Sequence, residues 1–245
     1  ASAFVGLNRL DEAKAIIGQA LAQKLDTSAM HRTLYRMPFV QGDATTMEQQ
    51  IAWAKGKPDE HVAQTWQAET AAFSGHPPRA REFSRLAFEL AERRNLKDVA
   101  AQIAAGAAGR DALLGNCRQV KEQTAKVLAI SQSQLTMLAA GQALAACGEA
   151  SRTQAITSEL AKQFPTDTLL NKVSLPLMHA RLEMQRGNPA GAVELLEPSR
   201  PYEGSALFQI AYLRGQAYVD LRRGADAAAE FQRILDHRGL QTAFP

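Results

Sequence analysis

The chain is poor in aromatic residues and has no segment that resembles a half-buried strand. Aromatic side chains make up 6% of the 245 residues, whereas Ala and Leu dominate the composition. Val, Ile and Thr do not gather in the alternating runs that half-buried strands require. We therefore expect almost no strand and an all-α protein.

Cysteine is also scarce, with only Cys117 and Cys147 in the whole chain. The two residues lie far apart in the sequence, and neither belongs to a Cys-x-x-Cys motif. This spacing predicts neither a metal site nor a disulfide framework. Because free cysteine is among the residues most often buried, the sequence predicts two buried thiols.

Blocks of one charge sign and long apolar runs are absent as well. The 28 basic and 25 acidic side chains are mixed along the chain and leave a formal charge of +3. This pattern argues against a dedicated nucleic-acid surface. The longest nearly apolar run, residues 135–147, is shorter than the roughly 20 residues that span a bilayer, so it predicts a buried helix.

Motifs of known catalytic chemistry are missing from the sequence. We find no His-Glu-x-x-His, no Gly-x-Ser-x-Gly, no phosphate loop ending in Gly-Lys-Ser/Thr, and no Cys with candidate His partners. The 5 histidines contain no pair spaced four apart, which argues against a metal site. We therefore expect a chain that is not an enzyme and that holds no cofactor and no metal.

A repeat is the main positive feature of the sequence. A turn position recurs at roughly 34-residue intervals, and each interval fits two antiparallel helices joined by a short turn. Small side chains such as Ala80 and Ala227 stand five residues after the turn, where they permit close helix packing. The turn positions are Asn8, Gly42, Gly75, Gly115, Gly148, Gly187 and Arg222.

The repeat period predicts a single solenoid domain over residues 1–245. Longer intervals predict irregular structure around residues 88–100 and 164–173, and Pro38 and Pro176 are predicted to bend or interrupt their helices. Neither end carries the polar cap that shields a terminal repeat, so we expect a piece of a longer chain. The predicted units are a half repeat 1–26 and repeats at about 28–58, 59–94, 95–130, 131–165, 166–203 and 204–238.

The last repeat resembles a known family. Gly215, Tyr218, Ala227 and Phe231 stand in the order of the tetratricopeptide signature, W-x2-L-G-x2-Y…A-x3-F. This resemblance implies an α-α superhelix of antiparallel helix pairs, with about six full repeats after the half repeat. It also implies that the first helix of each pair lines a concave groove that binds a protein or peptide.

The same resemblance implies which side chains face that groove. Arg, Trp and Tyr are favoured where binding energy concentrates, and an acidic or mixed peptide against the first two arginines is one form of partner. A simply solvated inner face is the alternative. The implied groove residues are Arg32, Arg36, Trp66, Glu69, Gln102, Gln142, Arg181, Gln209, Tyr212 and Gln216.

A narrower resemblance concerns residues 6–26, 160–170, 187–198 and 227–240. These segments are similar to the C-terminal tetratricopeptide regions found behind bacterial serine/threonine kinase domains, and sometimes behind winged-helix DNA-binding domains. The similarity implies a scaffold or sensory arm for signal transduction. Self-association and the effector arm of a winged-helix transcription regulator stay open as alternatives.

The expected partners follow from these points. They are a protein or peptide, or a second copy of the chain, and we expect no nucleic acid. Contact with a membrane is expected only through parts of a parent chain. The cytoplasm is the favoured location, and the extracytoplasmic side stays open if the parent has a membrane segment before the repeats.

Overall fold

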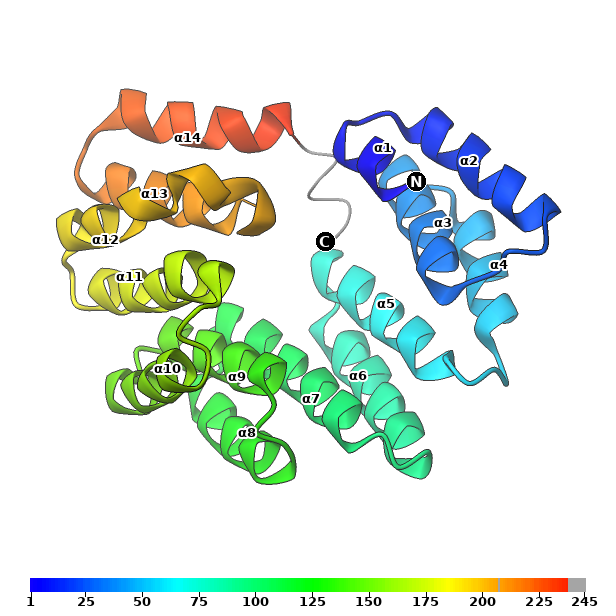
Figure 1. Ribbon diagram of the computed structural model, residues 1–245, viewed down its shortest axis with the longest axis horizontal. Coiled ribbons are helices and arrows are strands. Elements are labelled where there is room, and N and C mark those ends of the chain that lie inside the picture. Colours follow the sequence, from blue (N-terminus) through cyan, green and yellow to red (C-terminus); the bar gives the residue numbers. More distant parts are fainter. Residues whose placement is uncertain (207, 238–245) are drawn as a thin grey trace. The chain divides into compact units, whose positions relative to one another are not determined.

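The computed structural model describes residues 1–206 and 208–237, and within them every regular element is helical (Figure 1). The described residues form two compact units, with the helices of Ala1–Leu96 in unit 1 and those of Lys97–Asp236 in unit 2. Successive helices pack as pairs, which is consistent with a helical repeat. Residues 207 and 238 of the last predicted repeat lie outside the described part.

Unit 1 contains three helix pairs. Each pair falls within one predicted unit of the sequence, and α3 also packs on α5. The helices are α1 (Ser2–Gly6), α2 (Leu10–Ala22), α3 (Ser28–Gln41), α4 (Ala44–Ala54), α5 (Glu60–Phe73) and α6 (Pro77–Arg93).

Unit 2 contains four helix pairs, which follow one another in chain order (Figure 1). The first helices of these pairs pack on one another, α7 on α9, α9 on α11 and α11 on α13. The helices are α7 (Lys97–Leu113), α8 (Cys117–Ile130), α9 (Gln134–Ala146), α10 (Ala150–Gln163), α11 (Leu175–Gln185), α12 (Pro189–Leu196), α13 (Gln209–Asp220) and α14 (Gly224–Asp236), with a π-helix at Leu170–Ser174 and a 3₁₀ helix at Glu197–Ala206.

The turns inside the pairs share one backbone conformation. All seven predicted turn residues have positive φ, between 58° at Arg222 and 77° at Gly115. In each turn the next N–H bonds a carbonyl five residues back, as from Asp43 to Pro38 at 2.9 Å. This pattern ends one helix and frees the chain to reverse, and it favours glycine because a left-handed backbone crowds a Cβ. The predicted turn positions are confirmed.

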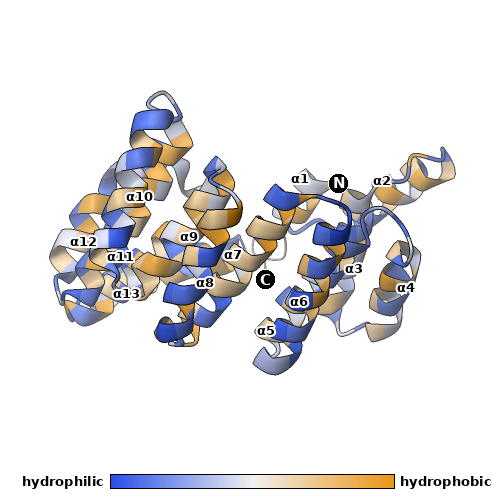
Figure 2. Ribbon diagram, turned by 90° about the horizontal axis from the view of Figure 1, so that it is seen from below, coloured by the Kyte–Doolittle hydropathy of each residue, from blue (hydrophilic) through white to orange (hydrophobic). Residues whose placement is uncertain are grey.

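Close packing between helices explains the small residues of the repeat. Ala80 and Ala227 are both buried. A Cβ added to Gly215 would lie 2.5 Å from Cε1 of Phe231, so only glycine lets α13 approach α14. Hydrophilic and hydrophobic residues occupy different faces of helices such as α6 and α8 (Figure 2). The apolar faces form the core between successive pairs.

The predicted irregularities appear as long helices and as a local change of helix type. Helices α6 and α7 have 17 residues each. The π-helix ends directly before α11, whose second residue is Pro176. Because Pro176 has no N–H to bond the carbonyl four residues back, the buried Ser199 hydroxyl donates to that Lys172 carbonyl instead, at 2.6 Å. Helix α3, in contrast, continues through Pro38 to Gln41.

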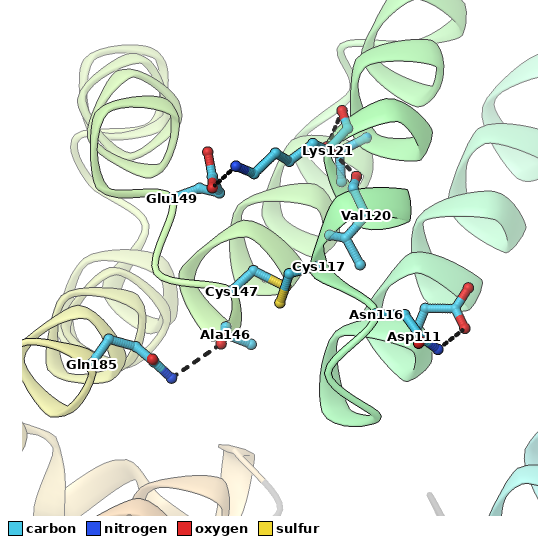
Figure 3. The surroundings of a disulfide bond; sticks show 10 residues. Asp111, Asn116, Cys117, Val120, Lys121, Ala146, Cys147, Glu149 and Gln185 are labelled. Atoms are coloured by element: carbon cyan, nitrogen blue, oxygen red, sulfur yellow. Dashed lines mark hydrogen bonds and ion pairs between the residues drawn. A yellow bond between two sulfur atoms is a disulfide. The ribbon is translucent and has the colours of Figure 1, made fainter.

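The two cysteines are bonded to each other, so the prediction of two buried thiols is wrong (Figure 3). Cys117 is the first residue of α8 and Cys147 directly follows α9, and both are half-buried. Each lies within two residues of a turn glycine, and these two turns belong to successive pairs. Stacking of the pairs therefore brings together cysteines that are far apart in the chain.

Candidate functional site

The ten predicted groove residues divide between the two units. Four of them lie on α3 and α5 of unit 1, namely Arg32, Arg36, Trp66 and Glu69. The other six lie on first helices of unit 2, namely Gln102 on α7, Gln142 on α9, Arg181 on α11, and Gln209, Tyr212 and Gln216 on α13.

In unit 1, the predicted groove residues do not form an open cationic surface, because Arg36 and Glu69 pair with each other. Arg36 is 5% exposed, and its Nη2 donates to Glu69 Oε2 at 2.5 Å. Arg32 is half-buried beside this pair. Burial lowers the pKa of Arg32 and the Arg36 charge adds to that effect, while Glu69 opposes it. Arg36 therefore already has a carboxylate partner within the protein.

Trp66 does not line an accessible face, and its prediction as a groove residue is wrong. The side chain is 2% exposed and packs with Tyr35, Ala54 and Ala63 in the core of unit 1. The small neighbours leave room for an indole, and the Tyr35 ring lies 5.7 Å from it between centroids. Removing this large apolar surface from water outweighs any advantage of exposing it.

The unit 2 residues lie on accessible surface. Gln209, Tyr212 and Gln216 form one exposed stripe of α13, whose other faces are largely buried, and Tyr212 is 53% exposed. Gln216 Nε2 donates to the Tyr212 hydroxyl at 3.3 Å. We call the six residues Gln102, Gln142, Arg181, Gln209, Tyr212 and Gln216 the first-helix face of unit 2.

Arg181 is the charged member of this face. It is half-buried, and its Nε has no hydrogen-bond partner. Burial lowers the pKa of Arg181 because it penalises the charged form, and the nearby Tyr212 hydroxyl partly opposes that effect. Arg181 and Tyr212 lie on helices α11 and α13, which pack on each other.

Two open depressions lie on the side of α11 opposite Arg181. One is lined by residues that include Pro176, Glu183 and Leu195, and the other by residues that include Gln154 and His179. Burial lowers the pKa of His179, and the Arg186 charge lowers it further. Ser151 lines the second depression together with His179.

The sequence prediction missed a buried ion pair between α13 and α14. Arg214 is fully buried, and its Nε and Nη2 donate to the two oxygens of Glu230, each at 2.7 Å. The only signal in the sequence is an arginine where the tetratricopeptide signature has Leu. This pair joins two helices of one repeat, so its role is structural.

A second missed cluster surrounds His31 in unit 1. Its two ring nitrogens lie 2.7 Å from oxygens of Asp26 and Gln50, and its ring stacks on Trp53 with 3.5 Å between centroids. Trp53 also donates to Asp26 at 3.0 Å. Burial favours a raised Asp26 pKa, but the hydrogen bonds from Trp53 and His31 outweigh it and lower the pKa. The cluster ties the loop before α3 to α4.

The described residues hold neither a helix that could span a membrane nor a metal-binding cluster. None of the helices in that part combines the length and the apolar character needed to cross a bilayer. Across residues 1–206 and 208–237, the His, Cys, Asp and Glu side chains form no group of three that could hold a metal ion. Comparison of the chain with protein-family models, with curated proteins and with solved structures found no match.

Proposed function

We propose that the chain is a non-catalytic binding module that holds a protein or peptide along the first-helix face of unit 2. One observation carries the proposal: Tyr212 is 53% exposed on a helix whose other large side chains are mostly buried, and this helix packs on α11, which carries the half-buried Arg181. Tyr and Arg are the residue types at which binding energy concentrates. An exposed aromatic and a partly desolvated cation on two adjoining helices are the kind of surface that a partner covers.

The repeat architecture supports the same proposal. Stacked helix pairs present their first helices as an extended surface, which in tetratricopeptide arrays is concave and binds extended partners. Under this proposal the chain is a tetratricopeptide-like solenoid and serves as a regulatory arm of a signalling protein. The packing of α7, α9, α11 and α13 on one another is the arrangement that such a surface requires.

The proposal is tested by selecting peptides without assuming their sequence. A random dodecapeptide library displayed on phage is panned against the chain, and enriched peptides are synthesised and titrated by calorimetry. Tyr212→Ala should weaken their binding by about tenfold or more, because truncating an aromatic hot spot typically costs over 1 kcal/mol. The matched control is Phe73→Ala, which removes another exposed aromatic ring in unit 1 and should leave binding unchanged.

Two outcomes would contradict the proposal. One is the absence of any peptide enriched above an unrelated helical protein, and the other is equal affinity of the wild type and Tyr212→Ala. Light-scattering mass over a hundredfold concentration range belongs to the same experiment. A rising mass that Tyr212→Ala abolishes would identify a second copy of the chain as the occupant of this face.

A further inference from the structure

We infer that Arg181 is the anchor of the first-helix face and that it takes a carboxylate of the bound protein or peptide. The inference rests on the proposed function and specifies the chemistry of its partner. It follows from where Arg181 lies, from what its charge lacks inside the protein, and from the shape of its guanidinium group.

The side of α11 on which Arg181 lies is shown by a hydrogen bond of Gln185, one turn further along the helix. Gln185 donates to the Ala146 carbonyl at the end of α9, at 3.2 Å, so this side of α11 is directed toward α9. Residues four apart share a helix face, and Arg181 therefore lies on the same side. His179 and Glu183, in contrast, line the depressions on the other side of α11.

The other buried arginines of first helices show what Arg181 lacks. Arg36 on α3 donates to Glu69, and Arg214 on α13 is held by both oxygens of Glu230. Within the part of the chain that the structure describes, Arg181 has no carboxylate partner and forms no ion pair, and its Nε is buried without an acceptor. A charged group that loses water without gaining a hydrogen-bond partner is destabilised. A ligand carboxylate would pair with the Arg181 guanidinium as Glu69 pairs with that of Arg36.

The chemistry favours a carboxylate over a more highly charged anion. A planar guanidinium matches the two oxygens of a carboxylate in a bidentate pair. Phosphate groups are usually held by several cations or by backbone N–H groups at a helix N-terminus, whereas Arg181 lies in the interior of α11. The Tyr212 hydroxyl, on the exposed side of the adjoining helix α13, is a further donor for such a carboxylate.

The test compares the peptides that two charge variants select. The random dodecapeptide library is panned against the wild type, against Arg181→Gln and against Arg85→Gln. Arg85 is an exposed arginine of α6 whose loss changes the net charge equally. Peptides selected by the wild type and by Arg85→Gln should be enriched in Asp or Glu, and those selected by Arg181→Gln should not be.

A double-mutant cycle then assigns the contact. For a selected peptide, changing its critical Glu to Gln should weaken binding to the wild type by about tenfold or more and should leave binding to Arg181→Gln almost unchanged. An equal loss with both proteins, or selected peptides without acidic residues, would overturn the inference. Neutral peptides whose binding depends on Tyr212 would leave the proposed function standing, whereas the absence of any selected peptide would remove both. Circular dichroism checks that Arg181→Gln is folded.

The disulfide carries a second and independent conclusion. From its place in the fold, we infer that the chain matures in a compartment that oxidises thiols. Cys117 and Cys147 have their Cα atoms 5.4 Å apart, within the usual range for a disulfide, and each stands next to a turn of a different helix pair. The separation is set by the stacking of the two pairs.

Other contacts hold the same turn in place. The Lys121 ammonium lies 2.6 Å from Glu149, just after Cys147, and Gln185 donates to Ala146, just before it (Figure 3). These links keep the two cysteines together whether or not they are oxidised. Because both cysteines are only half-buried, their thiols would be accessible to an oxidant.

Bond formation needs an external electron acceptor. The two thiols release two protons and two electrons, and a disulfide-bearing oxidant takes them up as it becomes a dithiol. Such oxidants act in the periplasm, in the secretory pathway and outside the cell, whereas the cytosol keeps accessible thiols reduced. This inference replaces the cytoplasmic expectation with an extracytoplasmic one.

The test is thiol trapping in the cells that make the protein. Intact cells are quenched with acid, and their proteins are denatured in the presence of a polyethylene glycol maleimide. The maleimide labels each free thiol, and each label slows the migration of the chain on a gel. The expected result is no retardation until a reductant is added first. Retardation of most molecules without reductant would overturn the inference. The Cys117→Ser/Cys147→Ser variant, which cannot react, marks the unmodified position.

Discussion

Removing the disulfide is the perturbation whose size follows most directly from the structure. The bond joins residues with a sequence separation of 30, from Cys117 in α8 to Cys147 after α9. A crosslink that closes a loop of this length lowers the entropy of the unfolded chain by roughly 12 cal/mol/K, or about 3.6 kcal/mol at 25 °C. The Cys117→Ser/Cys147→Ser variant should therefore lose about 3 to 4 kcal/mol of unfolding free energy in unit 2.

The assay is urea denaturation followed by circular dichroism, with hydrogen exchange to locate the effect. A loss of this size corresponds to a fall in Tm of roughly 7 to 14 °C for a domain of this size. Because repeat arrays unfold in parts, hydrogen exchange is read helix by helix. Faster exchange of the α8 and α9 amides, with α3 and α5 unchanged, would place the loss at the crosslink.

The matched control is the reductant. It should lower the stability of the wild type by the same amount and leave the double variant unchanged. A variant that stays within about 1 kcal/mol of the wild type would refute the reasoning. It would mean that these two helix pairs remain associated in the denatured chain, so that the bond has little entropy to remove.

Three further predictions concern packing, a buried ion pair and a helix cap. Gly215→Ala should destabilise unit 2 by roughly 1 to 3 kcal/mol in urea denaturation, because its Cβ would overlap the Phe231 ring. Arg214→Met should cost about 3 kcal/mol or more by the same assay, because it leaves the Glu230 carboxylate buried without its bidentate partner. Hydrogen bonds from the backbone N–H of Leu170, in the first turn of the π-helix, and from the Gln134 side chain lower the pKa of Asp167 below its ordinary value of 3.8. The ionised carboxylate therefore stabilises the folded protein above pH 3.8, and this stabilisation is lost as the pH falls through the lower pKa of the folded state. Asp167→Asn should therefore flatten the acid limb of a stability–pH profile.

Each of these predictions has its own control. Gly109→Ala lies in a helix interior with open space around the new Cβ, so it should stabilise by about 0.5 to 1 kcal/mol; destabilisation there would show that helix packing is not what distinguishes Gly215. Adding Glu230→Leu to Arg214→Met should recover most of the lost stability, and a further loss would argue against the buried-charge explanation. An unchanged acid limb in Asp167→Asn would assign the acid sensitivity to other carboxylates.

The predicted turns succeeded because their physical requirement is local. A backbone with positive φ favours residues such as Gly42 and Asn8, so the period of the repeat is visible in the sequence. The close approach at Gly215 is visible for the same reason, since only the absence of a side chain permits it. Arg222 is an exception: it has the same positive φ, although arginine does not favour that backbone conformation.

The candidate site was predicted less completely because exposure depends on neighbours from other repeats. Trp66 and Tyr212 are both aromatic residues of first helices. Small residues around Trp66 leave a space that its ring fills, whereas Tyr212 lies 6.1 Å from the Phe231 ring and stays 53% exposed. No pattern within a single helix distinguishes these two cases.

The all-helical class, the helix pairs and their turns could be predicted from the sequence, because they depend on side-chain period, residue size and the local freedom of the backbone. Two features come from contacts between helices: some arginines have internal carboxylate partners, and Cys117 meets Cys147. The Arg36–Glu69 pair and the disulfide depend on how one repeat stacks on the next, and the Arg214–Glu230 pair depends on how α13 packs on α14. Stacking places atoms from separate repeats within bonding distance, and no spacing along one helix specifies that contact.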